Sequence, residues 1–227
     1  MSTRAKEIAF NVASVRERMA SACKEIGRDV TEVQLIAVTK TYPLEDVDIL
    51  RNLGLENFAE NRDGEGRHKS SLVPATWHFQ GQIQSNKISS IASWADVIHS
   101  IDDIRHLRLI SKAIPDSKVV SVFIQVNLDS QPGRGGVSAE GLSPLAELAL
   151  ISPGVRLEGL MAVAPLGEKT ESTFARLAQI HSDFSQHFPS ATSLSAGMSG
   201  DFEVAIKYGA THVRVGSSIL GSRSHVG

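Results

Sequence analysis

The segment Leu35–Pro43 reads LIAVTKTYP and joins an apolar run directly to a lysine. Such a run is typical of a strand that is covered on both faces, as in a parallel sheet. Lys40 follows at the strand's end, although removing an ammonium group from water is costly. Its side chain could extend out of the sheet into water. Alternatively, desolvation and nearby cations could keep its amine partly neutral, ready to form an imine with a carbonyl compound.

Strands and helices alternate along the chain on both sides of this segment. Apolar runs predict eight strands, over residues 34–40, 56–61, 77–82, 96–102, 118–129, 155–165, 192–198 and 211–221. Spacings of three and four predict helices over residues 3–27, 43–54, 85–95, 103–114, 138–152, 170–188 and 201–209. We expect loops at 61–71 and 130–136. Eight apolar strands alternating with helices predict an α/β fold of the (β/α)8 TIM-barrel type.

The barrel is expected to be a single domain covering residues 1–227. No linker, low-complexity tract or change of composition divides the chain. The residues after Gly221 are too few for an eighth helix, so we expect the N-terminal helix to complete the outer ring.

Composition narrows the class of protein. The 227 residues carry a formal net charge of −2, which gives no basic excess for binding nucleic acid or a membrane surface. A single cysteine, Cys23, rules out an internal disulfide and indicates a reducing compartment. The first residues, MSTRAKEIAF, contain no long apolar region, so we expect neither a signal peptide nor a membrane span. We therefore expect a cytoplasmic protein, and a monomer because no large apolar stripe requires a partner.

Two short motifs follow the last two predicted strands. MSGD (198–201) places Ser199 where a helix begins, and VGSS (215–218) places Gly216 and Ser217 where the backbone can approach a ligand. Each could be an ordinary cap or turn, but loops after strands seven and eight are the usual phosphate site of such barrels. A lysine for an aldehyde opposite a phosphate site indicates pyridoxal phosphate.

Arg214 lies two residues before Gly216 and could reach under the pyridine ring of that cofactor. A guanidinium stays charged and can only donate hydrogen bonds, so the ring nitrogen would remain unprotonated and the cofactor would be a weak electron sink. The alternative is an interior arginine paired with an acid. The histidines show no metal-ligand spacing, so no metal site is expected.

At these residues the chain resembles the pyridoxal phosphate homeostasis protein family almost from end to end. AVTKTYP, NFAENR and WHFQGQIQSNK match the family's early motifs, and VFIQVN, GLMAVAP, LSAGMSGDFEVAI and THVRVGSSILGSR match its later ones in order. The family is similar to the barrel of fold-type III pyridoxal phosphate enzymes, the alanine racemase type, without their second domain.

The resemblance implies a role for each matching residue. It implies a Schiff base on Lys40, a phosphate contact from Ser199, and a backbone phosphate clamp at Gly216 and Ser217. It also implies that Arg214 faces the pyridine nitrogen and that Asn61 lies beside the cofactor. Four residues depart from the family's common pattern, namely Ala59, Arg62, Ala196 and Arg134. Of these, Arg62 puts the contacts beside Asn61 in question.

Three functions are compatible with a lysine and a phosphate site. The resemblance implies a carrier or regulator that holds pyridoxal phosphate and influences cofactor and amino-acid pools. An amino-acid racemase would need acid/base groups on both faces of its substrate, and Lys40 could serve one face. We find no candidate for the other face, because Tyr42 lies on the same loop as Lys40 and Tyr208 lies in a helix. An imine-forming aldolase acting on a sugar phosphate would also need a lysine and a phosphate site, but Arg214 would have no evident function in it. We therefore expect no established catalytic residue.

Overall fold

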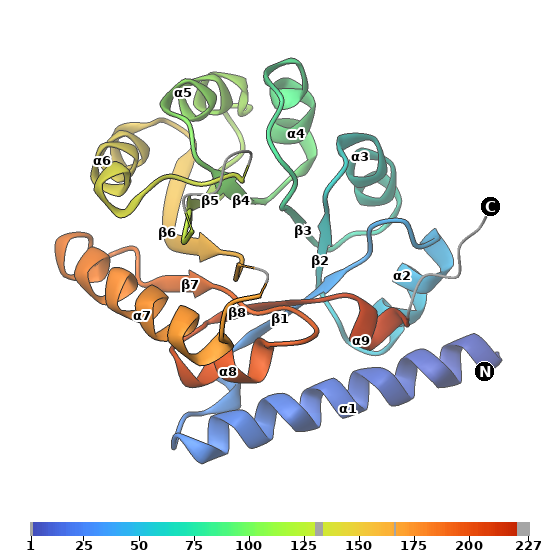
Figure 1. The fold of residues 1–227 in the computed structure, drawn as a ribbon. Coiled ribbons are helices and arrows are strands. Elements are labelled where there is room, and N and C mark those ends of the chain that lie inside the picture. Colours follow the sequence, from blue (N-terminus) through green and yellow to red (C-terminus); the bar gives the residue numbers. More distant parts are fainter. Residues whose placement is uncertain (1, 130–133, 166, 222–227) are drawn as a thin grey trace.

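Eight parallel strands close into a barrel in the computed structural model, which describes residues 2–129, 134–165 and 167–221. β1 pairs with β8 from Gln34 opposite His212 to Ala37 opposite Val215, and this pairing closes the barrel. The predicted fold class is confirmed (Figure 1). The strands are β1 (Gln34–Val38), β2 (Asn57–Glu60), β3 (Thr76–Phe79), β4 (Val97–Ile101), β5 (Val120–Val126), β6 (Val155–Ala162), β7 (Ser193–Ser195) and β8 (His212–Val215).

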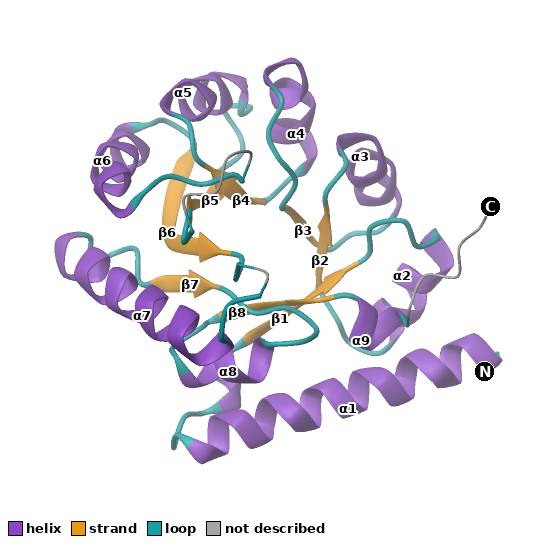
Figure 2. Cartoon of the chain, in the orientation of Figure 1, coloured by secondary structure: helices purple, strands orange, loops and turns teal. Residues whose placement is uncertain are grey.

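Helices surround the strands, as Figure 2 shows by colour. Most of them connect one strand to the next, the arrangement that parallel strands require. They are α2 (Leu44–Asn52), α3 (Asp63–Leu72), α4 (Ile88–Trp94), α5 (Ile104–Ala113), α6 (Leu142–Ile151), α7 (Thr170–His187), α8 (Phe202–Lys207) and α9 (Ser217–Leu220), with 3-10 turns η1 (Val30–Glu32), η2 (Ser85–Lys87) and η3 (Ala139–Gly141). No helix within the described ranges is long and apolar enough to cross a membrane.

The N-terminal helix α1 (Thr3–Glu25) packs along α8, α9 and α2 and so completes the outer ring, as expected (Figure 1). The Ser2 hydroxyl caps it by accepting a hydrogen bond from the amide of Ala5. Ile8, Val12 and Met19 of its apolar stripe are buried, and burying one such side chain contributes roughly 1.5–3 kcal/mol. The apolar stripe therefore ties the two ends of the described chain together.

Two segments have a different secondary structure from the one predicted. The segment 61–71, expected to be a loop, contains helix α3. Its glycines weaken helix propensity, but a Cβ on Gly66 would lie 2.3 Å from atoms of the Trp94 ring, so close packing requires glycine there. The strand predicted over 211–221 ends at Val215, and Ser217–Leu220 form the short helix α9. The other expected loop, 130–136, falls largely outside the described residues.

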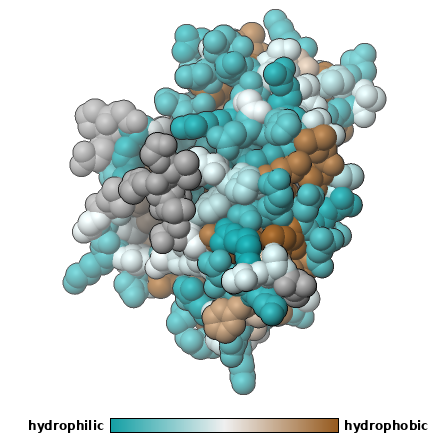
Figure 3. All heavy atoms as spheres, turned by 90° about the vertical axis from the view of Figure 1, so that its right-hand side faces the viewer, coloured by the Kyte–Doolittle hydropathy of each residue, from teal (hydrophilic) through white to brown (hydrophobic). Residues whose placement is uncertain are grey.

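Polar side chains lie on the surface and also inside the barrel. The face seen in Figure 3 is mostly hydrophilic, with apolar side chains in separate small patches. The interior is not purely apolar, because His78, His99, Ser195 and Arg214 are all buried. The His99 ring stacks on Phe123 with a centroid distance of 4.6 Å. Of these buried polar groups, Arg214 also lines the cavity described next.

Candidate functional site

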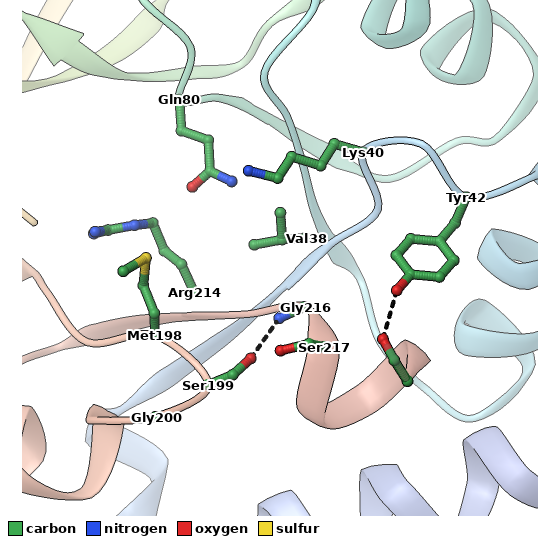
Figure 4. Close-up of a pocket in the computed structure, with 11 residues that line it drawn as sticks. Val38, Lys40, Tyr42, Gln80, Met198, Ser199, Gly200, Arg214, Gly216 and Ser217 are labelled. Atoms are coloured by element: carbon green, nitrogen blue, oxygen red, sulfur yellow. Dashed lines mark hydrogen bonds between the residues drawn. The ribbon is translucent and has the colours of Figure 1, made fainter. Parts of the chain in front are cut away.

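A cavity of about 520 Å³ opens near the C-terminal ends of the strands, and five of the six predicted site residues line it (Figure 4). This is the face on which TIM-barrel active sites are built. The lining residues are Val38, Lys40, Tyr42, Gln80, Met198, Ser199, Gly200, Arg214, Gly216, Ser217 and Gly221.

The sixth predicted residue, Asn61, does not line this cavity. It lines a neighbouring cavity of about 380 Å³, together with Arg62 and Lys87. Its Oδ1 atom is buried and has no hydrogen-bond partner among the described residues. A Cβ on Gly81 would lie 2.0 Å from the Asn61 carbonyl oxygen, so the chain after β3 passes very close to the chain after β2. A contact between Asn61 and a cofactor stays a prediction.

Lys40 lies two residues beyond β1, in the turn that leads to α2. Its side chain extends across the cavity, and its amine points toward the side-chain amide of Gln80 (Figure 4). Gln80 directly follows β3, so the two side chains enter the cavity from two different strand ends. The amine therefore faces the cavity and does not extend away from the barrel.

The opposite wall of the cavity is rich in hydrogen-bond donors. The Ser199 hydroxyl accepts hydrogen bonds from the amides of Gly216 and Ser218, each at 3.2 Å, which joins the loops after β7 and β8. A Cβ on Gly216 would come within 3.2 Å of the Val38 carbonyl oxygen, a tight contact. Backbone amides and hydroxyls grouped in this way suit a phosphate.

Arg214 lies in β8 between these two walls and is 4% exposed. It donates hydrogen bonds to the Ser195 hydroxyl at 2.6 Å and to the Ala162 carbonyl oxygen at 2.9 Å. Burial lowers the pKa of the guanidinium to about 10, while the negative charge of Asp201 opposes that shift. No salt bridge joins Arg214 to a carboxylate in the described part of the chain, so it is not the acid-paired interior arginine considered above.

A chain of hydrogen bonds leads from Arg214 through the barrel. Because Arg214 can only donate, the Ser195 hydroxyl is left to donate its proton to His99 Nδ1, at 2.9 Å. His99 Nε2 then donates to His78 Nδ1 at 2.8 Å, and His78 Nε2 donates to Asn57 Oδ1 at 3.1 Å. Burial lowers the pKa of His78 to about 3 and that of His99 well below its usual value, so both rings are neutral near pH 7.

The direction of these bonds has a consequence for the cavity. Arg214 is held by two neutral acceptors, the Ser195 hydroxyl and a main-chain carbonyl, so its positive charge is not cancelled by a bonded carboxylate. Its remaining N–H groups can serve only as donors toward the cavity. The site therefore offers a charged donor that cannot protonate a bound ring nitrogen.

Six residues that line the cavity were not predicted as site residues, and three of them contribute large side chains with polar or sulfur atoms. Tyr42 donates a hydrogen bond from its hydroxyl to the Gly221 carbonyl oxygen at 2.6 Å and closes one side. Gln80 faces Lys40, and Met198 lies beside Arg214 (Figure 4). Because Tyr42 and Gln80 follow strand ends, the rule that locates active sites at those ends could have found them.

This chain is similar to known proteins over most of its length. The profile of the alanine racemase N-terminal domain matches residues 8–224. The pyridoxal phosphate homeostasis protein of Corynebacterium glutamicum is 38% identical over 218 residues, covering 92% of this chain and 99% of that protein.

Solved structures extend the comparison. The structure of PipY from Synechococcus elongatus with pyridoxal phosphate bound has a TM-score of 0.80 and 30% identity, and the match covers 94% of this chain and 100% of PipY. An alanine racemase of Clostridium difficile has a TM-score of 0.74 at 13% identity, over 97% of this chain and 58% of the enzyme, which shows a shared fold alone.

Proposed function

Because the chain belongs to the pyridoxal phosphate homeostasis protein family, we propose that it holds pyridoxal phosphate as a Schiff base on Lys40. We further propose that it acts as a carrier or regulator of that cofactor in the cell, and not as a fast enzyme. The observation that carries the proposal is the single cavity that Lys40 shares with the donor-rich wall around Ser199 and Gly216 (Figure 4).

The residues present fit the cofactor in size and chemistry. A cavity of about 520 Å³ lies within the usual range of about 300–1,000 Å³ for small-molecule sites. The Ser199 hydroxyl and the amides of Gly216 and Ser217 would bind the phosphate, and Lys40 would supply the amine. Arg214 would donate to the ring nitrogen. When bound, the cofactor supplies an aldehyde and a conjugated ring that can accept electrons.

The charge of Arg214 supports a holding role over a catalytic one. It would place a donor against the ring nitrogen of the bound cofactor without protonating it, which would weaken the ring as an electron acceptor. Racemisation also needs a second acid/base group on the far side of the substrate. Tyr42 comes from the same turn as Lys40, and its hydroxyl is engaged by the Gly221 carbonyl oxygen.

The test is a trapping experiment on the purified full chain. We expect visible absorbance from a protein-bound Schiff base, and borohydride should fix the cofactor on Lys40, as located by peptide mass mapping. Lys40→Ala should abolish both signals, whereas Lys112→Ala, which removes an exposed lysine of α5, should leave both intact. Label at another lysine in the wild-type chain would contradict the assignment.

The carrier role needs a second measurement. The loaded protein should restore activity to a cofactor-free pyridoxal phosphate enzyme, and it should not racemise added amino acids above background. Steady racemisation near the rate of an ordinary enzyme, about 10 per second, would instead establish catalysis. Failure to release cofactor to any acceptor would leave binding intact but contradict delivery.

A further inference from the structure

The turn that carries Lys40 has an unusual backbone. Residues 39–42 turn tightly, and the Tyr42 amide donates to the Thr39 carbonyl oxygen at 3.1 Å. Within this turn Thr41 has a φ of 68°, the one positive φ at a non-glycine position in the described residues. A β-branched residue is disfavoured in this left-handed region, so neighbouring contacts must hold it there.

Three side chains outside the turn provide those contacts. Lys69 Nζ donates to the Thr39 carbonyl oxygen at 2.8 Å and to Glu60 Oε1 at 2.7 Å. The Thr39 hydroxyl donates to the same Glu60 oxygen at 2.7 Å. Glu65 Oε2 accepts the Thr41 amide at 2.7 Å and lies 3.7 Å from Lys69 Nζ. We call Glu60, Glu65 and Lys69 the clamp.

The clamp is assembled from two elements. Glu60 is the last residue of β2, and Glu65 and Lys69 lie one helical turn apart on α3. The Glu60 and Lys69 side chains are 0% and 6% exposed. Glu60 Oε2 is buried without a hydrogen-bond partner among the described residues, and burial raises the pKa of this carboxyl.

A buried ion pair of this kind is weak evidence for stability, because apolar residues of similar volume often stabilise a fold as well or better. The contacts of the clamp instead fall on the main chain to either side of Lys40, because Lys69 donates to the Thr39 carbonyl and Glu65 accepts from the Thr41 amide. They determine the direction in which the intervening side chain leaves the backbone.

We propose that Glu60, Glu65 and Lys69 are positioning residues that hold the Thr39–Thr41 backbone so that the Lys40 amine meets an incoming aldehyde. The Schiff base chemistry in this inference rests on the proposed function, whereas the hydrogen bonds of the clamp form without the cofactor. None of the three side chains lines the cavity. They act through Lys40 and are not themselves catalytic.

Glu65 is the best residue to perturb, because its side chain is 27% exposed and its loss should not unfold the barrel. Glu65→Ala removes the acceptor of the Thr41 amide, whereas Glu65→Gln keeps an oxygen that can accept it. Glu45→Ala is the matched control, since it removes an exposed glutamate from the first turn of α2, close to the same turn.

The first readout is the rate at which cofactor-free full chain forms a Schiff base with added pyridoxal phosphate, followed by absorbance. We expect Glu65→Ala to slow the rate about tenfold, the factor that corresponds to one lost hydrogen bond to a charged group. Glu65→Gln and Glu45→Ala should remain within about twofold of wild type. A wild-type rate for Glu65→Ala, or equal losses for Glu65→Ala and Glu65→Gln, would overturn the proposal.

The second readout does not use the cofactor. Hydrogen exchange at the Thr41 amide should be protected in the wild-type chain and in Glu65→Gln, and unprotected in Glu65→Ala. Equal protection in all three chains would show that Glu65 does not hold the Thr41 amide and would overturn the proposal. If wild-type protein formed no Schiff base at all, the proposed function would fail, while this exchange measurement would still decide whether the clamp exists.

A third variant tests the strained backbone. Thr41→Gly can adopt the same φ without steric cost, so the turn should depend less on Glu65. We expect Glu65→Ala to slow Schiff base formation by no more than about threefold in the Thr41→Gly background, against about tenfold in wild type. The same tenfold loss in both backgrounds would show that the Thr41 backbone is not what Glu65 holds.

Discussion

Acid should destabilise this barrel well above the pH at which carboxylates titrate, because its interior histidines are buried in the neutral form. Burial lowers the pKa of His78 to about 3 and that of His212 to about 4, against about 6.5 in an unfolded chain. Between these values the unfolded chain binds the extra proton and the folded one does not. Folding stability is therefore full above about pH 6.5 and falls as the pH drops below it.

The magnitude follows from the difference between folded and unfolded pKa values. At pH 5 the pH lies about 1.5 units below the pKa of a histidine in the unfolded chain. At about 1.4 kcal/mol per unit, protonation then stabilises the unfolded chain by about 2 kcal/mol for each such histidine. His78 is 1% exposed and should contribute this full amount, and half-buried His212 up to as much again. His99, whose pKa is also lowered by burial, acts in the same direction. A loss of about 4 kcal/mol is a large share of the roughly 5–15 kcal/mol typical of a domain.

Urea unfolding of the cofactor-free chain at pH 7, 6 and 5 measures this loss. His212→Gln should reduce the loss between pH 7 and pH 5 by up to half, whereas His68→Gln, which removes an exposed histidine of α3, should leave it unchanged. Equal free energies of unfolding at pH 7 and pH 5 would refute the reasoning. So would a His212→Gln chain that loses as much stability as wild type.

Two further predictions test the groups around the cavity. Ser195→Ala removes one of the two acceptors of Arg214 and should cost about 1–3 kcal/mol of unfolding free energy. Ser121→Ala removes one of the two acceptors of the exposed Arg156 and should cost less than about 1 kcal/mol; urea unfolding compares the two. Gly81→Ala should lower the melting temperature, since its Cβ would lie 2.0 Å from a main-chain oxygen and such overpacking costs about 1–3 kcal/mol. Gly64→Ala, where a Cβ meets nothing within 4 Å, should raise the melting temperature, because alanine is favoured over glycine in a helix by about 0.5–1 kcal/mol.

Much of the site could be predicted because it follows a rule of the fold. Apolar runs identify the strands, and residues at the ends of parallel strands share one face. That reasoning brought Lys40, Ser199, Arg214, Gly216 and Ser217 together, and the structure places all five in one cavity. It did not determine where a side chain after a strand would point, and Asn61 lies in the neighbouring cavity.

The errors in secondary structure have a common cause. Helix α3 was predicted to be a loop because its glycines and charges outweigh its apolar residues locally. What stabilises it is tertiary contact, with the Trp94 ring occupying the space that a side chain at Gly66 would need and Lys69 paired to Glu60. Propensity is a weak indicator wherever such contacts decide the conformation.

The sequence by itself determined the order of the elements, the class of fold and the identity of the side chains at the strand ends, because each of these follows from patterns within a short segment. Only the tertiary structure decided which polar groups meet inside the barrel. Arg214 reaches Ser195, His99 reaches Ser195 from another strand, and Lys69 reaches the Thr39 carbonyl. Such contacts join residues far apart in the chain, and their geometry depends on how the strands register when the barrel closes.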